Sequence, residues 1–289
     1  MIEVAQGSPG SGKSAVAVAR AILHLKRGGV VAANFSLVDG WAEAVVRSTL
    51  LFRFLNLFRF FCQEWLWFYV YKRATCLHKR FFRVDSLSAI RQIDPLNLSV
   101  GLYRNKGGFS EGEGLLILDE CQLVFNARKW EKNFDWIVFF TQHRKLHWDV
   151  VLIAHSIEMI DSQVRPLAEY SSTFRNMQKL RVPILGLPMS PIPLFIVIKK
   201  YAGLGAGATV VHSRDLYPLP LWAARLYDSL LVFNAEDWGK DTEPHNCGVS
   251  PVIPDSFLPR KRNSVLYGPH WDKYLQTQSV FLPSCHKRI

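Results

Sequence analysis

The sequence is poor in acidic residues and in cysteine. Its 289 residues include 24 Asp and Glu against 35 Lys and Arg, which gives a net charge of +11 at pH 7. Such an excess of basic residues favours an anionic partner: nucleic acid, anionic lipid or a polyphosphate ligand. The five cysteines are scattered and form no Cys-x-x-Cys pair. A disulfide framework and a cysteine zinc site are therefore not indicated, and reduced thiols in a cytosolic context are expected.

Long uninterrupted apolar segments are also missing. The N-terminus carries an acidic residue at position 3 and has no apolar run of the kind found in secretory signals. Residues 182–198 are apolar but contain four prolines, and residues 50–71 contain two arginines and a glutamate. Neither segment therefore has the pattern of a membrane-spanning helix.

The sequence does contain an alternation of apolar strands and helices. Strands are expected at residues 2–5, 30–35, 115–118 and 150–154, helices at 14–27, around 136–145 and at 221–233, and short strands or extended chain at 182–213. Gly28 and Gly29 follow the first helix, where glycine commonly ends helices. The alternation predicts an α/β fold with a mostly parallel sheet that is covered by helices on both faces.

The strongest motif is a complete GxxxxGK[ST] match between the first strand and the first helix. It consists of Gly7, Ser8, Pro9, Gly10, Ser11, Gly12, Lys13 and Ser14, with Ala15 directly after it. The backbone N–H groups of such a loop bind phosphates, helped by the positive end of the helix dipole. Lys13 is expected to reach the β- and γ-phosphates, and the Ser14 hydroxyl to bind Mg²⁺. The motif thus predicts ATP and Mg²⁺ as ligands of a P-loop NTPase.

A second motif lies at the end of the strand at 115–118, where Asp119 and Glu120 follow four apolar residues. An aspartate in this position typically holds the water shell of Mg²⁺ in P-loop proteins. The adjacent Glu120 is placed to orient and deprotonate an attacking water molecule. These residues predict a hydrolase of the catalytic-glutamate class.

His155 follows the strand at 150–154. In P-loop ATPases with a catalytic carboxylate, this strand usually lies between the Asp-Glu strand and the P-loop strand. His155 is therefore a candidate sensor of the γ-phosphate or of the attacking water. Fast hydrolysis also needs a transition-state arginine, often supplied by a neighbouring subunit. The candidates are Arg144, Arg165 and Arg175, and a homo-oligomer is expected.

Residues 47–83 differ in composition from the rest of the chain. They contain eight Lys and Arg against one Glu, together with twelve aromatic residues, and we interpret them as a basic, aromatic helical insertion. A helix from about 50 to 71 would carry a narrow polar stripe of Arg53, Asn56, Arg59 and Gln63. Its wide apolar face predicts contact with lipid, with DNA or a partner subunit, or with its own domain.

Several motifs together resemble the zonula occludens toxin family, the assembly ATPases of filamentous phages. The resemblance covers roughly residues 1–235. It rests on the P-loop, Val31-Ala-Ala-Asn34, Leu118-Asp119-Glu120-Cys121-Gln122, Phe125-Asn-Ala-Arg128, Gln142-His143-Arg144-Lys145, the strand Trp148–Ile153, and Leu226-Tyr227-Asp228-Ser229. We expect a P-loop ATPase domain at 1–235 and a proline-rich, extended tail at 236–289.

The resemblance implies an ATPase that drives virion assembly or export at the cytoplasmic face of the host inner membrane, with phage DNA or coat proteins as partners. Two alternatives remain from the residues themselves: a genome-packaging ATPase of another phage type, and a P-loop kinase. The Asp-Glu pair suits activation of water better than kinase chemistry, and no arginine-rich lid follows the fourth strand. A GTPase is disfavoured because Asn105-Lys106-Gly107-Gly108 lacks the aspartate that guanine recognition needs.

Overall fold

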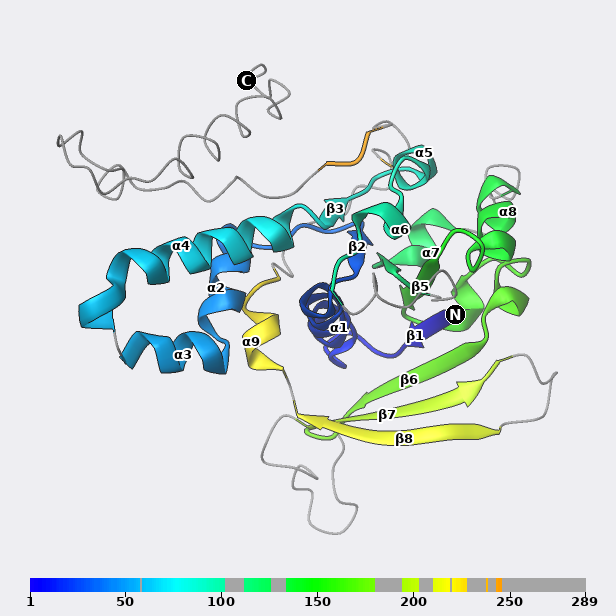
Figure 1. Ribbon diagram of the computed structural model, residues 1–289. Helices are drawn as coiled ribbons and strands as arrows, with labels where there is room; N and C mark the ends of the chain where they lie inside the picture. Colours follow the sequence, from blue (N-terminus) through cyan, green and yellow to red (C-terminus); the bar gives the residue numbers. More distant parts are fainter. Residues whose placement is uncertain are drawn as a thin grey trace, which may run out of the picture. The chain divides into compact units, whose positions relative to one another are not determined.

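A computed structural model describes residues 1–57, 59–101, 112–125, 134–179, 194–202, 210–218, 220–227, 238 and 243–245, without the side chains of 57–65 (Figure 1). These residues belong to a compact unit, Met1–Pro251. The second unit, Val252–Ile289, lies outside the described residues, and so does most of the tail expected at 236–289.

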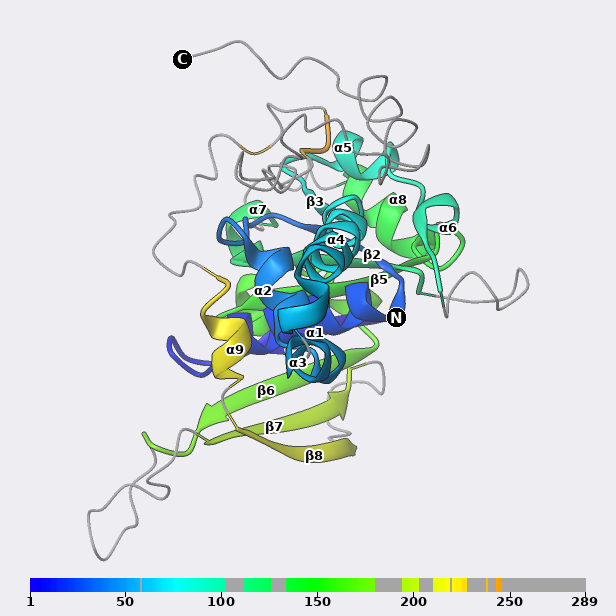
Figure 2. The same ribbon diagram turned by 60° about the vertical axis from the view of Figure 1, so that its left-hand side comes forward.

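In the described part of the chain, eight strands form one sheet in the order β3-β2-β4-β5-β1-β6-β7-β8. The strands are β1 (Ile2–Gln6), β2 (Val30–Ala33), β3 (Phe81–Arg83), β4 (Gly114–Leu118), β5 (Trp148–Ala154), β6 (Tyr170–Asn176), β7 (Leu194–Tyr201) and β8 (Val211–Pro218). The first six in the spatial order run parallel, and β7 and β8 complete an antiparallel end (Figure 2). This confirms the predicted mostly parallel sheet, with β5 between β4 and the P-loop strand β1.

Two apolar layers cover the parallel strands (Figure 1). One contains α1 (Lys13–Arg27), α2 (Trp41–Arg47), α4 (Arg59–His78) and α9 (Leu221–Ala224), and the other contains α5 (Leu87–Arg91), α7 (Cys121–Val124) and α8 (Phe134–Gln142). The described elements also include the short helix α6 (Pro95–Leu98) and the 3₁₀ turns η3 (Ile157–Met159) and η4 (Arg165–Leu167). Residues alternate between the layers, with Val31 in the first and Val30 in the second. Burial of both faces explains why these strands read as continuous apolar runs.

The segment 47–83 is divided differently from the prediction. The single helix expected at 50–71 is two helices, α3 (Leu50–Leu57) and the longer α4. Val70, Ala74 and Leu77 on the second half of α4 are buried in the core, and β3 at the end of the segment pairs with β2 in the sheet. Only α3 and the first half of α4 extend beyond the sheet (Figure 1).

One basic residue of that segment has a structural role. Arg80 is buried, and its Nη1 donates hydrogen bonds to the carbonyls of Leu25 and Gly29 at 2.9 and 3.1 Å. These carbonyls lie where α1 ends, at the left-handed Gly28 (φ 105°). The positive charge of Arg80 therefore satisfies the C-terminus of the P-loop helix rather than an external anion.

The helix expected at 221–233 does not continue from Ala224 to Tyr227 in the structure, and residues 228–233 lie outside the described residues. α9 ends at Ala224, and Tyr227 forms an antiparallel bridge with Leu37. The long-range pairing with Leu37 requires extended backbone, which overrides the helical pattern of the sequence. Among the described residues, the helices are all too short or too polar to cross a bilayer.

Candidate functional site

The P-loop lies between the end of β1 and the start of α1. Gly10 (φ 71°) and Gly12 (φ 87°) are left-handed, a conformation that strains other residues. A Cβ on Gly12 would also meet the Phe195 ring at 3.0 Å. The glycines at these two positions therefore allow the loop to curl and direct its N–H groups toward an anion, beside the positive end of α1.

Lys13 is folded back over the loop. Its Nζ donates hydrogen bonds to the carbonyls of Gly7 at 2.7 Å and Ser8 at 3.2 Å. Burial lowers the pKa of Lys13, while the nearby carboxylates of Asp119 and Glu120 oppose that change. The ammonium thus contacts the loop in the neighbourhood of two acidic residues, at the place where phosphate groups bind in P-loop proteins.

Asp119 follows β4 and lies next to the first turn of α1. The Ser14 hydroxyl lies near its carboxylate as a donor, and its Oδ1 accepts the N–H of Glu120 at 2.9 Å. Burial raises the pKa of Asp119, and these hydrogen bonds counteract part of the change. The structure thus brings together the hydroxyl and the carboxylate expected to hold Mg²⁺.

The main chain of Asp119 is held by a residue of another strand. Asn34, which follows β2, donates from Nδ2 to the Asp119 carbonyl at 2.8 Å and accepts from the Asp119 N–H through Oδ1 at 2.7 Å. Both groups are buried. Asn34 appeared in the sequence only as part of the Val31-Ala-Ala-Asn34 motif, without a role.

Glu120 has an unusual backbone conformation. It adopts φ 51° and ψ 37°, the left-handed region that glutamate rarely occupies and that is concentrated at functional sites. Its Oε2 lies 3.4 Å from His155 Nε2 and accepts a hydrogen bond from Gln122 Nε2. The His155 carbonyl accepts the N–H of Gly7 at 3.2 Å. The candidate base and the candidate sensor therefore lie together beside the P-loop.

Tyr227 is a further residue of the site, and the sequence did not predict this role. Its hydroxyl donates to Asp119 Oδ2 at 3.1 Å, and its ring packs edge-on against Phe35 with centroids 5.2 Å apart. Burial and the neighbouring Asp119 raise the pKa of the phenol, so the hydroxyl stays protonated as a donor. The signal for Tyr227 was its place in the Leu226-Tyr227-Asp228-Ser229 motif.

The three candidate arginines lie in different places. Arg144 forms a 2.9 Å ion pair with Glu169, which lies at the start of β6 beside Met1, at the opposite end of β1 from the P-loop. Arg165 donates to the carbonyls of Ile160 and Glu158, and Arg175 is exposed on β6. Arg144 therefore lies away from the phosphate site of its own chain.

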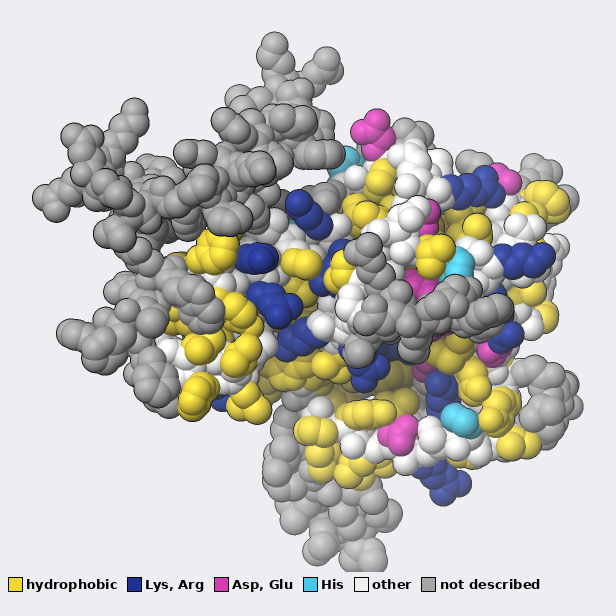
Figure 3. Space-filling view, in the orientation of Figure 1, with side chains coloured by type: hydrophobic (Ala, Val, Ile, Leu, Met, Phe, Trp, Pro, Cys, Tyr) yellow, Lys and Arg dark blue, Asp and Glu magenta, His cyan; other side chains and the backbone are white. Residues whose placement is uncertain are grey.

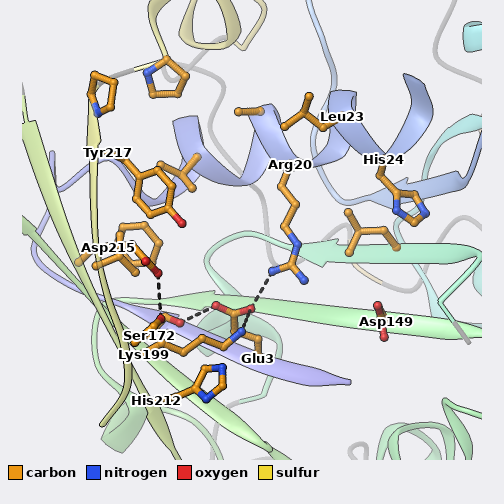
Figure 4. A pocket seen from close by; sticks show the side chains of 18 of the residues that line it. Glu3, Arg20, Leu23, His24, Asp149, Ser172, Lys199, His212, Asp215 and Tyr217 are labelled. Carbon is orange, nitrogen blue, oxygen red and sulfur yellow. Dashed lines mark hydrogen bonds and ion pairs between the residues drawn. The ribbon is translucent and has the colours of Figure 1, made fainter. Parts of the chain in front are cut away.

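A separate cavity of about 780 Å³ lies between α1 and strands β6, β7 and β8. At its floor Glu3 accepts hydrogen bonds from Arg20 Nη1 at 2.7 Å, from the Ser172 hydroxyl, and from Lys199 Nζ at 3.4 Å (Figure 4). Burial acts to raise the pKa of Glu3, but these partners hold it below its ordinary value. The network ties α1 and β7 to the middle of the sheet.

The parallel sheet, the glycine loop at the start of α1 and the Ser14–Asp119 pair define a P-loop NTPase fold and site. A family model described as Zonular occludens toxin (Zot) matches residues 76–189. The Gene 1 protein of Enterobacteria phage I2-2 is 30% identical over 283 residues, covering 92% of this chain and 66% of that protein. The Gene 1 protein of Salmonella phage IKe is 29% identical with the same coverage. The chain belongs to the Zot family, as the resemblance predicted.

The chain spans 66% of the length of these two phage relatives. Among solved structures, the N-terminal domain of zonular occludens toxin from Neisseria meningitidis is similar to 78% of this chain and 98% of its own, with 12% identity and a TM-score of 0.40.

Proposed function

We propose that the chain is an ATPase that drives assembly or export of a filamentous phage. The observation that carries the hydrolase assignment is the position of Glu120. Its carboxylate is held between His155 and Gln122, beside Lys13 and the Ser14–Asp119 pair. A carboxylate oriented next to a phosphate site is the group that activates water, whereas a kinase excludes water from its phosphate donor.

In this proposal each residue has a defined task. The loop N–H groups and the start of α1 hold the phosphates, and Lys13 contacts the β- and γ-phosphates. Ser14 and Asp119 hold Mg²⁺, which neutralises phosphate charge when bound. Glu120 accepts a proton from water while the water oxygen bonds to the γ-phosphorus and the bond to the ADP oxygen breaks. His155 keeps the Glu120 carboxylate in position and senses the γ-phosphate.

The biological role rests on the family. The relatives are phage proteins, and we propose residues 1–235 as the ATPase domain of a homo-oligomer. Its partners in this proposal are phage DNA or coat proteins. ATP hydrolysis drives their transfer into the virion. A ring or similar oligomer would allow a neighbouring subunit to supply the transition-state arginine.

We place this activity at the cytoplasmic face of the host inner membrane. Leu50, Leu51 and Phe54 of α3 are 82%, 52% and 59% exposed, and Arg47 and Arg53 lie in the same part of the sequence. Figure 3 shows hydrophobic and basic side chains interleaved over α3 and α4. This combination suits the surface of an anionic membrane.

Calorimetric titration with ATP and Mg²⁺, together with phosphate release, tests the ATPase proposal. The parent is expected to bind and hydrolyse ATP, and Lys13→Ala to bind it at least about tenfold more weakly because a charge-assisted contact is lost. Lys145→Ala, at an exposed lysine, is the matched control and should behave like the parent. Absence of ATP binding by the parent, or equal binding by Lys13→Ala, would show that the proposal is wrong.

A further inference from the structure

Four consecutive carbonyls of the P-loop accept hydrogen bonds from side chains. Lys13 serves those of Gly7 and Ser8. Two residues outside the motif donate to the next two carbonyls. Lys179 Nζ donates to the Pro9 carbonyl at 2.7 Å, and Asn176 Nδ2 donates to the Gly10 carbonyl at 3.2 Å. Side-chain donors therefore hold the backbone of this anion-binding loop at four consecutive residues.

The strand order explains how residues so distant in sequence reach the loop. β6 pairs in parallel with β1, and Thr173 lies opposite Gln6. Both strands therefore end at the same edge of the sheet, and the turn after β6 lies beside the P-loop. That turn is itself ordered, because the Asn176 carbonyl accepts the N–H of Lys179 at 3.2 Å and its Oδ1 accepts the N–H of Gln178 at 2.9 Å.

The ammonium of Lys179 lies very close to the loop backbone. A Cβ built on Gly10 would be 3.1 Å from Lys179 Nζ, so the charge rests against the left-handed glycine of the phosphate cradle. The charge of Lys179 is also one of the influences that lower the pKa of Lys13. Two lysine charges that are far apart in the sequence thus lie at the same loop.

We propose that Lys179 is a second phosphate-binding lysine of this site, supplied by the same chain, and that Asn176 positions it against the loop. The inference rests on the proposed function and deepens it. A neutral carbonyl is a weaker acceptor for an ammonium group than a charged phosphate oxygen. The flexible stem of lysine lets Nζ move from Pro9 onto the phosphates of a nucleotide, whose negative charge Lys13 and Lys179 then share.

Two variants of Lys179 distinguish the effect of its charge from the effect of its hydrogen bond to the loop. Lys179→Gln keeps an N–H donor for the Pro9 carbonyl but removes the charge, and Lys179→Arg keeps both. ATP and ADP affinities are measured by calorimetry with Mg²⁺ at low and high salt, with Lys13→Ala as the positive and Lys145→Ala as the negative control. We expect Lys179→Gln to bind ATP about tenfold more weakly, with a smaller salt dependence, and Lys179→Arg to restore most of the affinity.

The outcomes are distinct from those of the proposed function. If Lys13→Ala loses ATP affinity but Lys179→Gln binds like the parent, Lys179 only braces the loop, and this inference is wrong while the ATPase proposal stands. If Lys179→Gln binds weakly and Lys179→Arg equally weakly, charge is not the cause, and the inference is again wrong. If the parent binds no ATP, both proposals fail together. Unchanged thermal unfolding of Lys179→Gln excludes general destabilisation as the reason for weak binding.

Discussion

The hydroxyl of Tyr227 donates a hydrogen bond to Asp119 Oδ2 at 3.1 Å, although the two residues are 108 positions apart in the sequence. Asp119 directly follows strand β4, whereas Tyr227 lies beyond α9, after the antiparallel end of the sheet. The segment after α9 is thereby joined directly to the carboxylate that we assign to Mg²⁺. A change in the position of this segment would change the orientation of that carboxylate.

Tyr227→Phe tests this link. The variant keeps the ring that packs on Phe35 but removes the donor to Asp119. Loss of such a supporting hydrogen bond typically weakens a metal site about 10-fold or more. The Mg²⁺ concentration for half-maximal ATP hydrolysis should therefore rise about tenfold, with Tyr201→Phe as a control. An unchanged Mg²⁺ dependence would contradict the role of Tyr227.

Glu120→Gln is expected to separate binding from hydrolysis. The amide keeps the size and the contacts of the side chain, but it cannot accept a proton from water. Loss of a general base typically slows a reaction about 100-fold or more, while ATP affinity should stay near that of the parent. Single-turnover phosphate release and calorimetry measure the two quantities. Hydrolysis at the parental rate would assign the base to another group.

Arg80→Met tests the buried arginine at the end of α1. Methionine retains the apolar stem but leaves the carbonyls of Leu25 and Gly29 without the donors that they have now. Loss of charged hydrogen bonds at a buried position should lower the free energy of unfolding by about 2–4 kcal/mol. Urea denaturation measures the difference, and exposed Lys79→Met should stay within about 0.5 kcal/mol of the parent. If Arg80→Met were as stable as the parent, water or another group would have to donate hydrogen bonds to the carbonyls at the end of α1.

Glu3→Gln tests the charged network at the floor of the cavity. The partners Arg20, Ser172 and Lys199 hold the pKa of Glu3 below its ordinary value, so its contribution to stability is present above the unfolded pKa and is lost as pH falls through the folded pKa. At pH 7 the variant should be about 1–3 kcal/mol less stable than the parent. The difference should shrink below about pH 4, where glutamate is normally protonated.

Urea unfolding of both proteins across this pH range measures the Glu3 effect, and exposed Glu158→Gln serves as the control. A stability difference that stays constant from pH 7 to pH 3 would show that packing, not the charge of Glu3, is responsible.

The exposed apolar residues of α3 allow a membrane test that leaves the core intact, whereas the second half of α4 belongs to the core. Leu50→Ser combined with Leu51→Ser should reduce co-sedimentation with anionic liposomes and leave ATP binding unchanged, since less apolar surface enters the lipid. The control is Leu96→Ser, a similarly exposed leucine of α6. Equal co-sedimentation of the double variant would show that α3 is not the membrane contact.

The sequence by itself determined the elements whose signals are local. The P-loop lies in consecutive residues, and Asp119 and Glu120 directly follow an apolar strand, so spacing alone identified them and the parallel α/β fold. The break between α3 and α4 and the early end of α9 were not predicted. Both lie in segments where apolar periodicity continues past the last residue of a helix.

Only the tertiary structure decided which other residues join the site. Asn34, Lys179 and Tyr227 come from three separate segments, and they meet at the P-loop because β2, β4, β1 and β6 end at one edge of the sheet. In the same way, the structure assigned Arg80 to the end of α1, although composition alone had grouped it with the basic, aromatic insertion at 47–83. Such contacts depend on the order of the strands in the sheet and on where distant segments pack together. A local pattern of residue types contains no information about either.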